Sequence, residues 1–109
     1  MEKSAREAFD ACVAMKGEDV RLLLVADLTI VAEYFVICTA TSGQHARSIA
    51  EEIQKRLREG YGLRSRGMEA DPNGWWILLD FGDIICHVFQ RDAREYYAID
   101  DTWADAAVV

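Results

Sequence analysis

Two nearly continuous apolar runs, Val20–Ala26 and Tyr34–Ala40, restrict the fold of this chain more than any other feature of its sequence. Both are far shorter than the roughly 20 residues of a membrane span. Neither alternates between apolar and polar positions as a strand with one wet face does. Each run therefore predicts a β-strand covered on both faces, which requires helices packed against a sheet.

Two amphipathic helices are predicted around these strands. In the first, apolar side chains recur at helical spacing from Ala5 to Met15, and Gly17 is placed to end the helix. Ser4 and Glu7 have the spacing of a capping box at its start. The second helix is predicted to begin after Ser42, its expected N-cap, and to end near Gly60 and Gly62. Its apolar stripe is formed by Ala46, Ile49, Ala50, Ile53 and Leu57.

The second half of the chain predicts further strands and a helical tail. A short edge strand is expected at 63–68 and a turn at 71–74. Two strands at 75–80 and 84–90 are expected to form a tight hairpin. Residues 91–109 predict one or two short helices. The order of elements predicts one α/β or α+β domain over residues 1–109, with a mixed sheet of about five strands flanked by helices.

The cysteines and the N-terminus indicate a cytoplasmic protein. Cys12, Cys38 and Cys86 are odd in number and lack C-x-x-C spacing, which favours neither a disulfide framework nor a zinc ribbon. Cys38 and Cys86 lie within apolar runs, as buried thiols do in a reducing compartment. No apolar signal core follows the N-terminus, and no run is long enough to span a membrane. We therefore expect a soluble cytoplasmic chain.

The net charge of −7 is concentrated near the C-terminus. Residues 67–109 hold nine acidic and two basic side chains, whereas residues 47–66 hold three acidic and six basic ones. An acidic chain lacks the basic face that contact with nucleic-acid phosphates needs, so no direct nucleic-acid binding is expected. A basic protein surface would suit the acidic end as partner, although the acidity also fits a role in solubility alone.

Two polar constellations are candidates for chemistry. The junction from Thr39 to His45 places hydroxyls and an imidazole at a helix start, where free amides bind anions, but Ser42 acting only as a cap explains it as well. Asp80, Asp83 and His87 surround the predicted hairpin. A metal site, acid–base chemistry, turn chemistry and a protein-contact surface all remain open for them.

The dipeptide Trp75-Trp76 begins a predicted strand. Alternation sends one indole inward and the other outward. The outward ring is either an interface anchor or a ring covered by the C-terminal helices. A cysteine nucleophile is disfavoured, because Cys86 and His87 are neighbours on a strand and point to opposite faces.

Taken together, these segments resemble the ribosomal silencing factor (RsfS/Iojap) family along nearly the whole chain. Its most diagnostic part is Trp76-Ile-Leu-Leu-Asp-Phe-Gly-Asp-Ile-Ile-Cys-His-Val-Phe89. The other matching pieces are Lys16-Gly17-Glu18-Asp19-Val20, Ala32-Glu33-Tyr34-Phe35-Val36-Ile37, Thr39-Ala40-Thr41-Ser42 with His45, and Arg94, Tyr97 and Trp103 in the tail. The chain departs from the family pattern at Glu33, Ala40 and Ala70, where Asp, Gly and Gly are usual; the last change affects the loop leading to the tryptophans.

The resemblance implies a binding protein with no cofactor, no metal and no enzymatic activity. Family members bind the large ribosomal subunit through ribosomal protein fourteen, a basic protein at the intersubunit face. They block association with the small subunit and repress translation under nutrient limitation. The resemblance also implies a core like that of nucleotidyltransferases. The expected partner-binding residues are Glu69, Trp76, Asp80, Asp83, His87 and Tyr97, with Trp76 buried on the partner and the carboxylates meeting Lys or Arg.

Two other functions are kept as alternatives. An assembly factor for the large subunit would use the same partner, and a homodimer in isolation also remains open. A nucleotidyltransferase-like enzyme would need carboxylates that hold Mg²⁺ beside a Gly-Ser turn. The chain has Ser42-Gly43 in the reverse order, and its only close acidic pair on the predicted sheet is Asp80 and Asp83.

Overall fold

The computed structural model describes residues 2–71 and 73–109. Its helices are α1 (Glu2–Ala14), α2 (Gly43–Tyr61), α3 (Arg91–Tyr97) and α4 (Ile99–Thr102). Its strands are β1 (Glu18–Leu24), β2 (Tyr34–Ala40), β3 (Gly67–Ala70), β4 (Trp76–Asp80), β5 (Ile84–Gln90) and β6 (Ala107–Val108).

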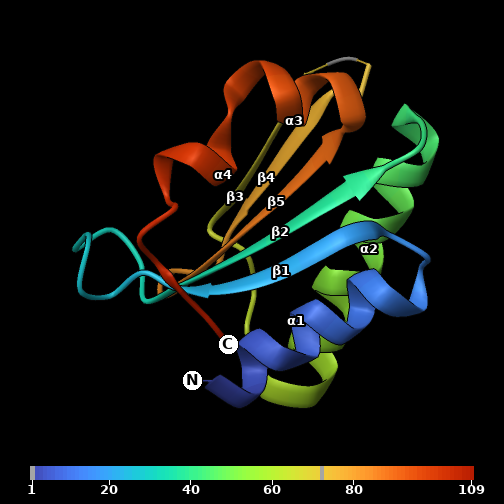
Figure 1. Ribbon diagram of the computed structural model, residues 1–109. Helices are drawn as coiled ribbons and strands as arrows, with labels where there is room; N and C mark the ends of the chain where they lie inside the picture. Colours follow the sequence, from blue (N-terminus) through green and yellow to red (C-terminus); the bar gives the residue numbers. More distant parts are fainter. Residues whose placement is uncertain (1, 72) are drawn as a thin grey trace.

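The strands form one mixed sheet in the order β3-β4-β5-β2-β1-β6. The central strands β2 and β5 are parallel, and every other neighbouring pair is antiparallel. Helices α1 and α2 lie against one face of the sheet, and α3 and α4 lie on the other (Figure 1). The predicted α+β class with a mixed sheet flanked by helices is confirmed.

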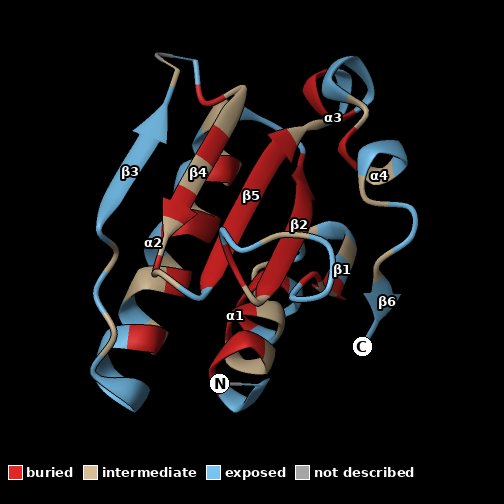
Figure 2. Ribbon diagram, turned by 90° about the vertical axis from the view of Figure 1, so that its left-hand side faces the viewer, coloured by how far each residue is buried: buried red, intermediate tan, exposed pale blue. Residues whose placement is uncertain are grey.

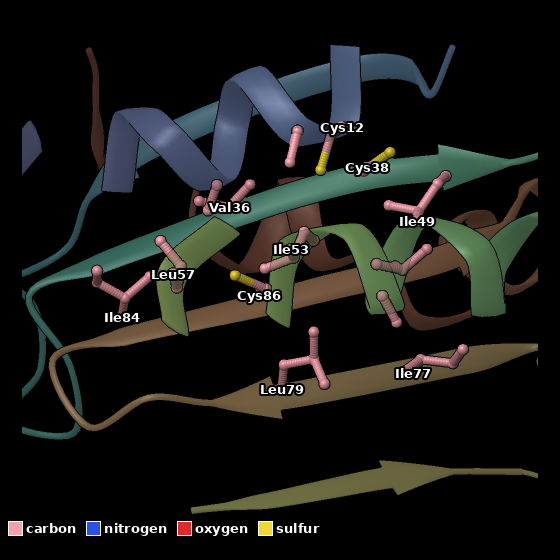
Figure 3. Close-up of a cluster of buried hydrophobic side chains, with 14 of the residues drawn as sticks. Cys12, Val36, Cys38, Ile49, Ile53, Leu57, Ile77, Leu79, Ile84 and Cys86 are labelled. Atoms are coloured by element: carbon pink, nitrogen blue, oxygen red, sulfur yellow. The ribbon is translucent and has the colours of Figure 1, made fainter. Parts of the chain in front are cut away.

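The larger apolar core lies between the sheet and the α1–α2 layer, and a smaller one lies on the side of α3 and α4. Every residue of β2 is buried, as predicted for a strand covered on both faces. Figure 3 shows apolar side chains from α2, β2, β4 and β5 meeting in the larger core, together with the three thiols. Burial raises the pKa of the Cys86 thiol, and a hydrogen bond with Cys38 raises that of Cys12. The thiols of Cys12 and Cys86 are therefore protonated packing groups.

The prediction that β1 is buried on both faces holds only for Leu22 and Leu23, which lie in the apolar clusters on the two sides of the sheet, and not for the rest of the strand. Only Leu22 and Leu23 of this strand are buried, and Arg21 is exposed on the α4 side, 3.8 Å from the Asp100 carboxylate. The physical reason is position in the sheet. Beyond β1 lies only the two-residue strand β6, so this margin of the sheet has too little cover to bury a strand.

The ends of the two long helices are capped in different ways. Ser42 caps α2 as predicted, since its Oγ accepts a hydrogen bond from the His45 backbone N–H at 3.0 Å. Helix α1 already includes Glu2, so Ser4 lies inside the helix and the predicted capping box was wrong. At the other end of α1, Lys16 takes the left-handed conformation (φ 63°). The N–H groups of Lys16 and Gly17 then bond back to Val13 and Cys12, which is a Schellman ending.

Several predicted boundaries shift in the second half of the chain. The edge strand predicted at 63–68 is β3, four residues at Gly67–Ala70. The hairpin after β4 is confirmed, with Gly82 at φ 91°. The short tail helices are confirmed, but β6 was not predicted, so the sheet has six strands and not about five. Of the predicted turn at 71–74, Pro72 lies outside the described residues, and the Gly74 N–H bonds to the Asp71 carbonyl at 3.0 Å.

Candidate functional site

An aromatic and acidic hollow lies where β3, β4 and α3 meet on the side of the sheet opposite α1 and α2. Its volume is about 310 Å³. We call it the aromatic hollow; it is lined by Glu69, Ala70, Asp71, Trp75, Trp76, Leu78 and Tyr97. In Figure 2, α3 and α4 stand over the β2 side of this face, and β3 is exposed along its whole length. The structure thus brings together three of the six predicted partner-binding residues: Glu69, Trp76 and Tyr97.

The Trp76 indole is stacked within this site and does not project from it. Its ring lies 5.3 Å from the Phe89 ring at 18° and 4.7 Å from the Tyr97 ring. Within residues 2–71 and 73–109, its buried Nε1 has no hydrogen-bond partner. Helix α3 therefore covers part of Trp76, which was one of the two expected outcomes, and the remaining surface of the ring is a wall of the aromatic hollow.

The two tryptophans do not point to opposite faces as predicted. Strand β4 begins at Trp76, so Trp75 precedes the strand and need not follow the alternation of side chains between its two faces. The Trp75 ring lies 5.6 Å from Tyr96 and 5.7 Å from Tyr97, on the same side as Trp76. The Asp71 carboxylate accepts a hydrogen bond from the Trp75 backbone N–H and fixes this arrangement.

The carboxylates of Asp80 and Asp83 lie away from the aromatic hollow. Asp80 ends β4, four residues from Trp76, which corresponds to roughly 13 Å along a strand. Its Oδ1 accepts the Gly82 N–H at 2.8 Å, as expected for turn chemistry. Asp83 is exposed in the same turn, and its backbone carbonyl accepts the N–H groups of Glu33 and Tyr34. The structure therefore does not gather all six predicted residues at one point.

His87 lies between these two groups and is buried. Its imidazole is surrounded by the rings of Phe35, Trp76 and Phe89, at 5.0, 6.1 and 5.9 Å. Neither ring nitrogen has a hydrogen-bond partner among the described residues. Burial lowers the pKa of His87 to about 4, so the imidazole is neutral near pH 7. It does not join Asp80 and Asp83 in a metal or acid–base site.

The junction at Thr39–His45 is occupied by internal hydrogen bonds. The Nδ1 atom of His45 accepts the Thr41 N–H at 2.9 Å, which leaves Nε2 to donate to the Met15 carbonyl at 2.7 Å. His45 thus ties the start of α2 to the end of α1. Ser42 acts as a cap, so this junction is structural and offers little to an anion.

A larger hollow of about 540 Å³ lies beside α3, and it is built around the buried guanidinium of Arg94. The Nε and Nη2 atoms donate to the two Asp100 carboxylate oxygens at 2.9 and 3.0 Å. The Nη1 atom donates to the Asp19 carbonyl and to Thr39 Oγ1 at 2.7 and 2.8 Å. The hydrogen bond from Arg94 lowers the pKa of Asp100. Because all these donors are used within the fold, Arg94 is a structural tie between α3, α4, β1 and β2.

The turn that carries the aromatic hollow rests directly on the start of α2. A Cβ atom added to Gly43 would lie 2.1 Å from the Asn73 carbonyl oxygen, and one added to Gly74 would lie 2.9 Å from the Gly43 Cα. We expect Gly43→Ala to lower the free energy of unfolding by about 1–3 kcal/mol, because backbone must move to admit the methyl group. Urea denaturation followed by far-UV circular dichroism measures this change.

Gly60 provides the matched control on the same helix. A Cβ atom there meets nothing within 4 Å. Gly60→Ala should therefore raise the free energy of unfolding by about 0.5–1 kcal/mol through helix propensity. Equal effects of the two substitutions would show that the contact between Gly43 and the turn does not constrain the fold.

Comparison with known proteins identifies the family. The family model described as "Ribosomal silencing factor during starvation", RsfS, matches residues 1–109. The chain belongs to the RsfS family. The resemblance inferred from the sequence motifs is thereby confirmed.

Individual RsfS relatives agree with this assignment. The chain is 36% identical over 96 residues to the ribosomal silencing factor RsfS of Bacillus subtilis, covering 88% of the chain and 80% of that protein. It is 32% identical over 92 residues to the chloroplastic Iojap protein of Arabidopsis thaliana, covering 84% of the chain and 38% of that longer protein. The crystal structure of a Chromobacterium violaceum protein superposes with a TM-score of 0.90 at 29% identity, over 95% of this chain and 86% of that one.

Four residues that line the aromatic hollow of this RsfS chain were not among the six predicted partner-binding residues: Ala70, Asp71, Trp75 and Leu78. Leu78 follows Trp76 by two positions on β4, so strand alternation alone places it on the same face. The sequence around Asp71 predicted only a turn. The position of Asp71 beside the hollow depends on the packing of that turn against α2.

The described part of the chain offers no site for a metal ion and no membrane span. Within residues 2–71 and 73–109, no group of three or more His, Cys, Asp or Glu side chains is arranged to hold a metal. Over the same residues, no helix combines the length and the apolar character that crossing a bilayer requires.

Proposed function

We propose that this RsfS-family chain binds the large ribosomal subunit through ribosomal protein fourteen and so prevents the small subunit from joining. Translation would then be repressed under nutrient limitation, in the cytoplasm, where subunits associate. The observation that carries this proposal is the family match over the whole chain.

The site supports binding through a protein surface. The face that carries the aromatic hollow combines partly exposed aromatic rings with the carboxylates of Glu69 and Asp71. Aromatic side chains with a charged rim are typical of protein interfaces. The acidic C-terminal part of the chain, residues 67–109, would repel RNA phosphates but attract a basic ribosomal protein.

Co-sedimentation tests the proposed function. The purified protein is mixed with isolated large subunits, isolated small subunits and joined ribosomes. We expect it to sediment with free large subunits and to reduce the fraction of joined particles as its concentration rises. Absence of binding to any particle at protein concentrations well above micromolar would contradict the proposal.

Charge reversal at Glu69 tests which surface is used. Glu69 is exposed on β3 and belongs to the aromatic hollow, so Glu69→Lys should weaken binding to large subunits roughly tenfold or more by placing like charges together. Glu51→Lys makes the same change in charge on α2, which covers the opposite side of the sheet, and should alter the affinity less than twofold. Equal affinities of the two variants in a co-sedimentation titration would remove this face from the interface.

A further inference from the structure

The aromatic rings that line the hollow are held in place by one another. Trp76 is fixed flat against Phe89, and Tyr97 closes over it from α3. Trp75 is fixed in turn by Tyr96 and Tyr97. A side chain stacked in this way forms a wall, so the partner must supply the group that enters.

The hollow carries negative charge that the fold does not neutralise. Glu69 pairs with Leu78 across the two strands, which places its side chain on the same face as Trp76. Among the described residues, no ion pair or hydrogen bond engages its carboxylate, and no Lys or Arg lines the hollow. Asp71 adds a second carboxylate, which holds the Trp75 N–H. The occupant should therefore be a cation.

The size and shape of the hollow indicate one side chain. A volume of about 310 Å³ lies at the small end of the range for ligand sites. Faces of Trp and Tyr attract a cation placed over them, and a planar guanidinium also stacks on the ring. The same group can donate two parallel hydrogen bonds to a carboxylate such as that of Glu69, which an ammonium group cannot do.

We propose that the aromatic hollow binds a single arginine side chain presented by the protein partner, stacked against Trp76 and Tyr97 and paired with the Glu69 carboxylate. This inference rests on the proposed function for the nature of the partner, since a basic ribosomal protein supplies such side chains. It reverses the expectation that Trp76 is itself the group buried in the partner.

The test uses the full chain and a small probe in place of the ribosome. Indole N–H signals of Trp75, Trp76 and Trp103 are followed by nuclear magnetic resonance during titration with N-acetyl-arginine amide. Trp103 is an internal control, because it packs on Phe35, 4.8 Å away, and does not line the hollow. We expect saturable shifts of Trp75 and Trp76, with a Kd on the order of ten millimolar, and an unmoved Trp103 signal.

Matched probes and variants test whether the hollow selects a guanidinium group and whether Glu69 pairs with it. N-acetyl-leucine amide should give no saturable shift, and N-acetyl-lysine amide should bind several-fold more weakly than the arginine probe. Glu69→Gln should weaken arginine binding several-fold, whereas Glu51→Gln should leave it unchanged. No shift with arginine, equal shifts with leucine, or equal affinity for lysine would each overturn the proposal.

The two proposals fail separately. Normal binding to large subunits without any arginine response would overturn the arginine hollow and leave the proposed function standing. A saturable, Glu69-dependent arginine response without subunit binding would support the hollow as an arginine receptor and contradict the ribosomal partner.

Discussion

Arg94→Met is expected to lower the free energy of unfolding by about 3 kcal/mol. The Arg94 guanidinium is 7% exposed and ties α3 to Asp100, to the Asp19 carbonyl and to Thr39 Oγ1. Methionine retains the apolar stem and removes every one of these donors. The Asp100 side chain is 30% exposed, so water can solvate its carboxylate once the guanidinium is gone. The expected loss of stability therefore lies at the lower end of the range for a broken buried ion pair.

The neighbouring residue Arg91 supplies the control for this prediction. It also belongs to α3 and pairs with Glu18 at 2.7 Å, but its side chain is 70% exposed. Arg91→Met should therefore change stability by less than about 1 kcal/mol. Urea denaturation of the two variants at pH 7 makes the comparison, and similar small losses would show that the Arg94 network contributes little to the fold.

Acidification from pH 6.5 to pH 4 should cost the protein about 3 kcal/mol through His87 alone. Burial holds the pKa of this imidazole at about 4 in the folded state, whereas in the unfolded chain it has its ordinary value of about 6.5. Between these values the unfolded state binds more protons, so stability falls as the pH falls. Below about pH 4 the imidazole is protonated in both states, and its contribution stops changing.

His87→Leu isolates this effect. Leucine keeps an apolar side chain beneath Trp76 and Phe35 but cannot take up a proton. Between pH 6.5 and pH 4, the free energy of unfolding of the variant should fall by about 3 kcal/mol less than that of the unchanged protein. The pKa of Asp100 is lowered in the folded state, so its contribution to stability also begins to fall as the pH approaches 4, but Asp100 is present in both proteins and its contribution cancels in their comparison. Parallel pH profiles of the two proteins would rule out a buried, neutral His87.

The elements that the sequence predicts well are those encoded by local pattern. The run Tyr34–Ala40 is a buried strand from end to end, and the stripe from Ala46 to Leu57 is the buried face of α2. The position of Gly82 in the hairpin follows from turn chemistry in the same way. Each of these predictions needs only neighbours within a few residues, since period and turn preference act over that range.

The candidate site is less predictable because distant segments build it. Tyr97 belongs to α3, while Glu69 belongs to an edge strand whose register against Leu78 is set by pairing. Trp75 escaped the alternation rule because β4 starts one residue later than expected. The burial of His87 depends on rings from Phe35, Trp76 and Phe89, on three different strands. The contacts of Tyr97 with Trp76, and of His87 with Phe35 and Trp76, join segments far apart in the chain and are not visible in a local window of sequence.

The parallel pairing of β2 with β5 also has a consequence for when the site forms. Partners such as Tyr34 and Ile84 are separated by the whole of α2, β3 and β4, so this pairing closes a long loop and is slow compared with hairpin formation. During synthesis the first six elements emerge before β5, and α3 with Tyr97 emerges later still. A nascent chain cannot form the aromatic hollow until the residues as far as Tyr97 have emerged, so the hollow is among the last features of the described fold to assemble.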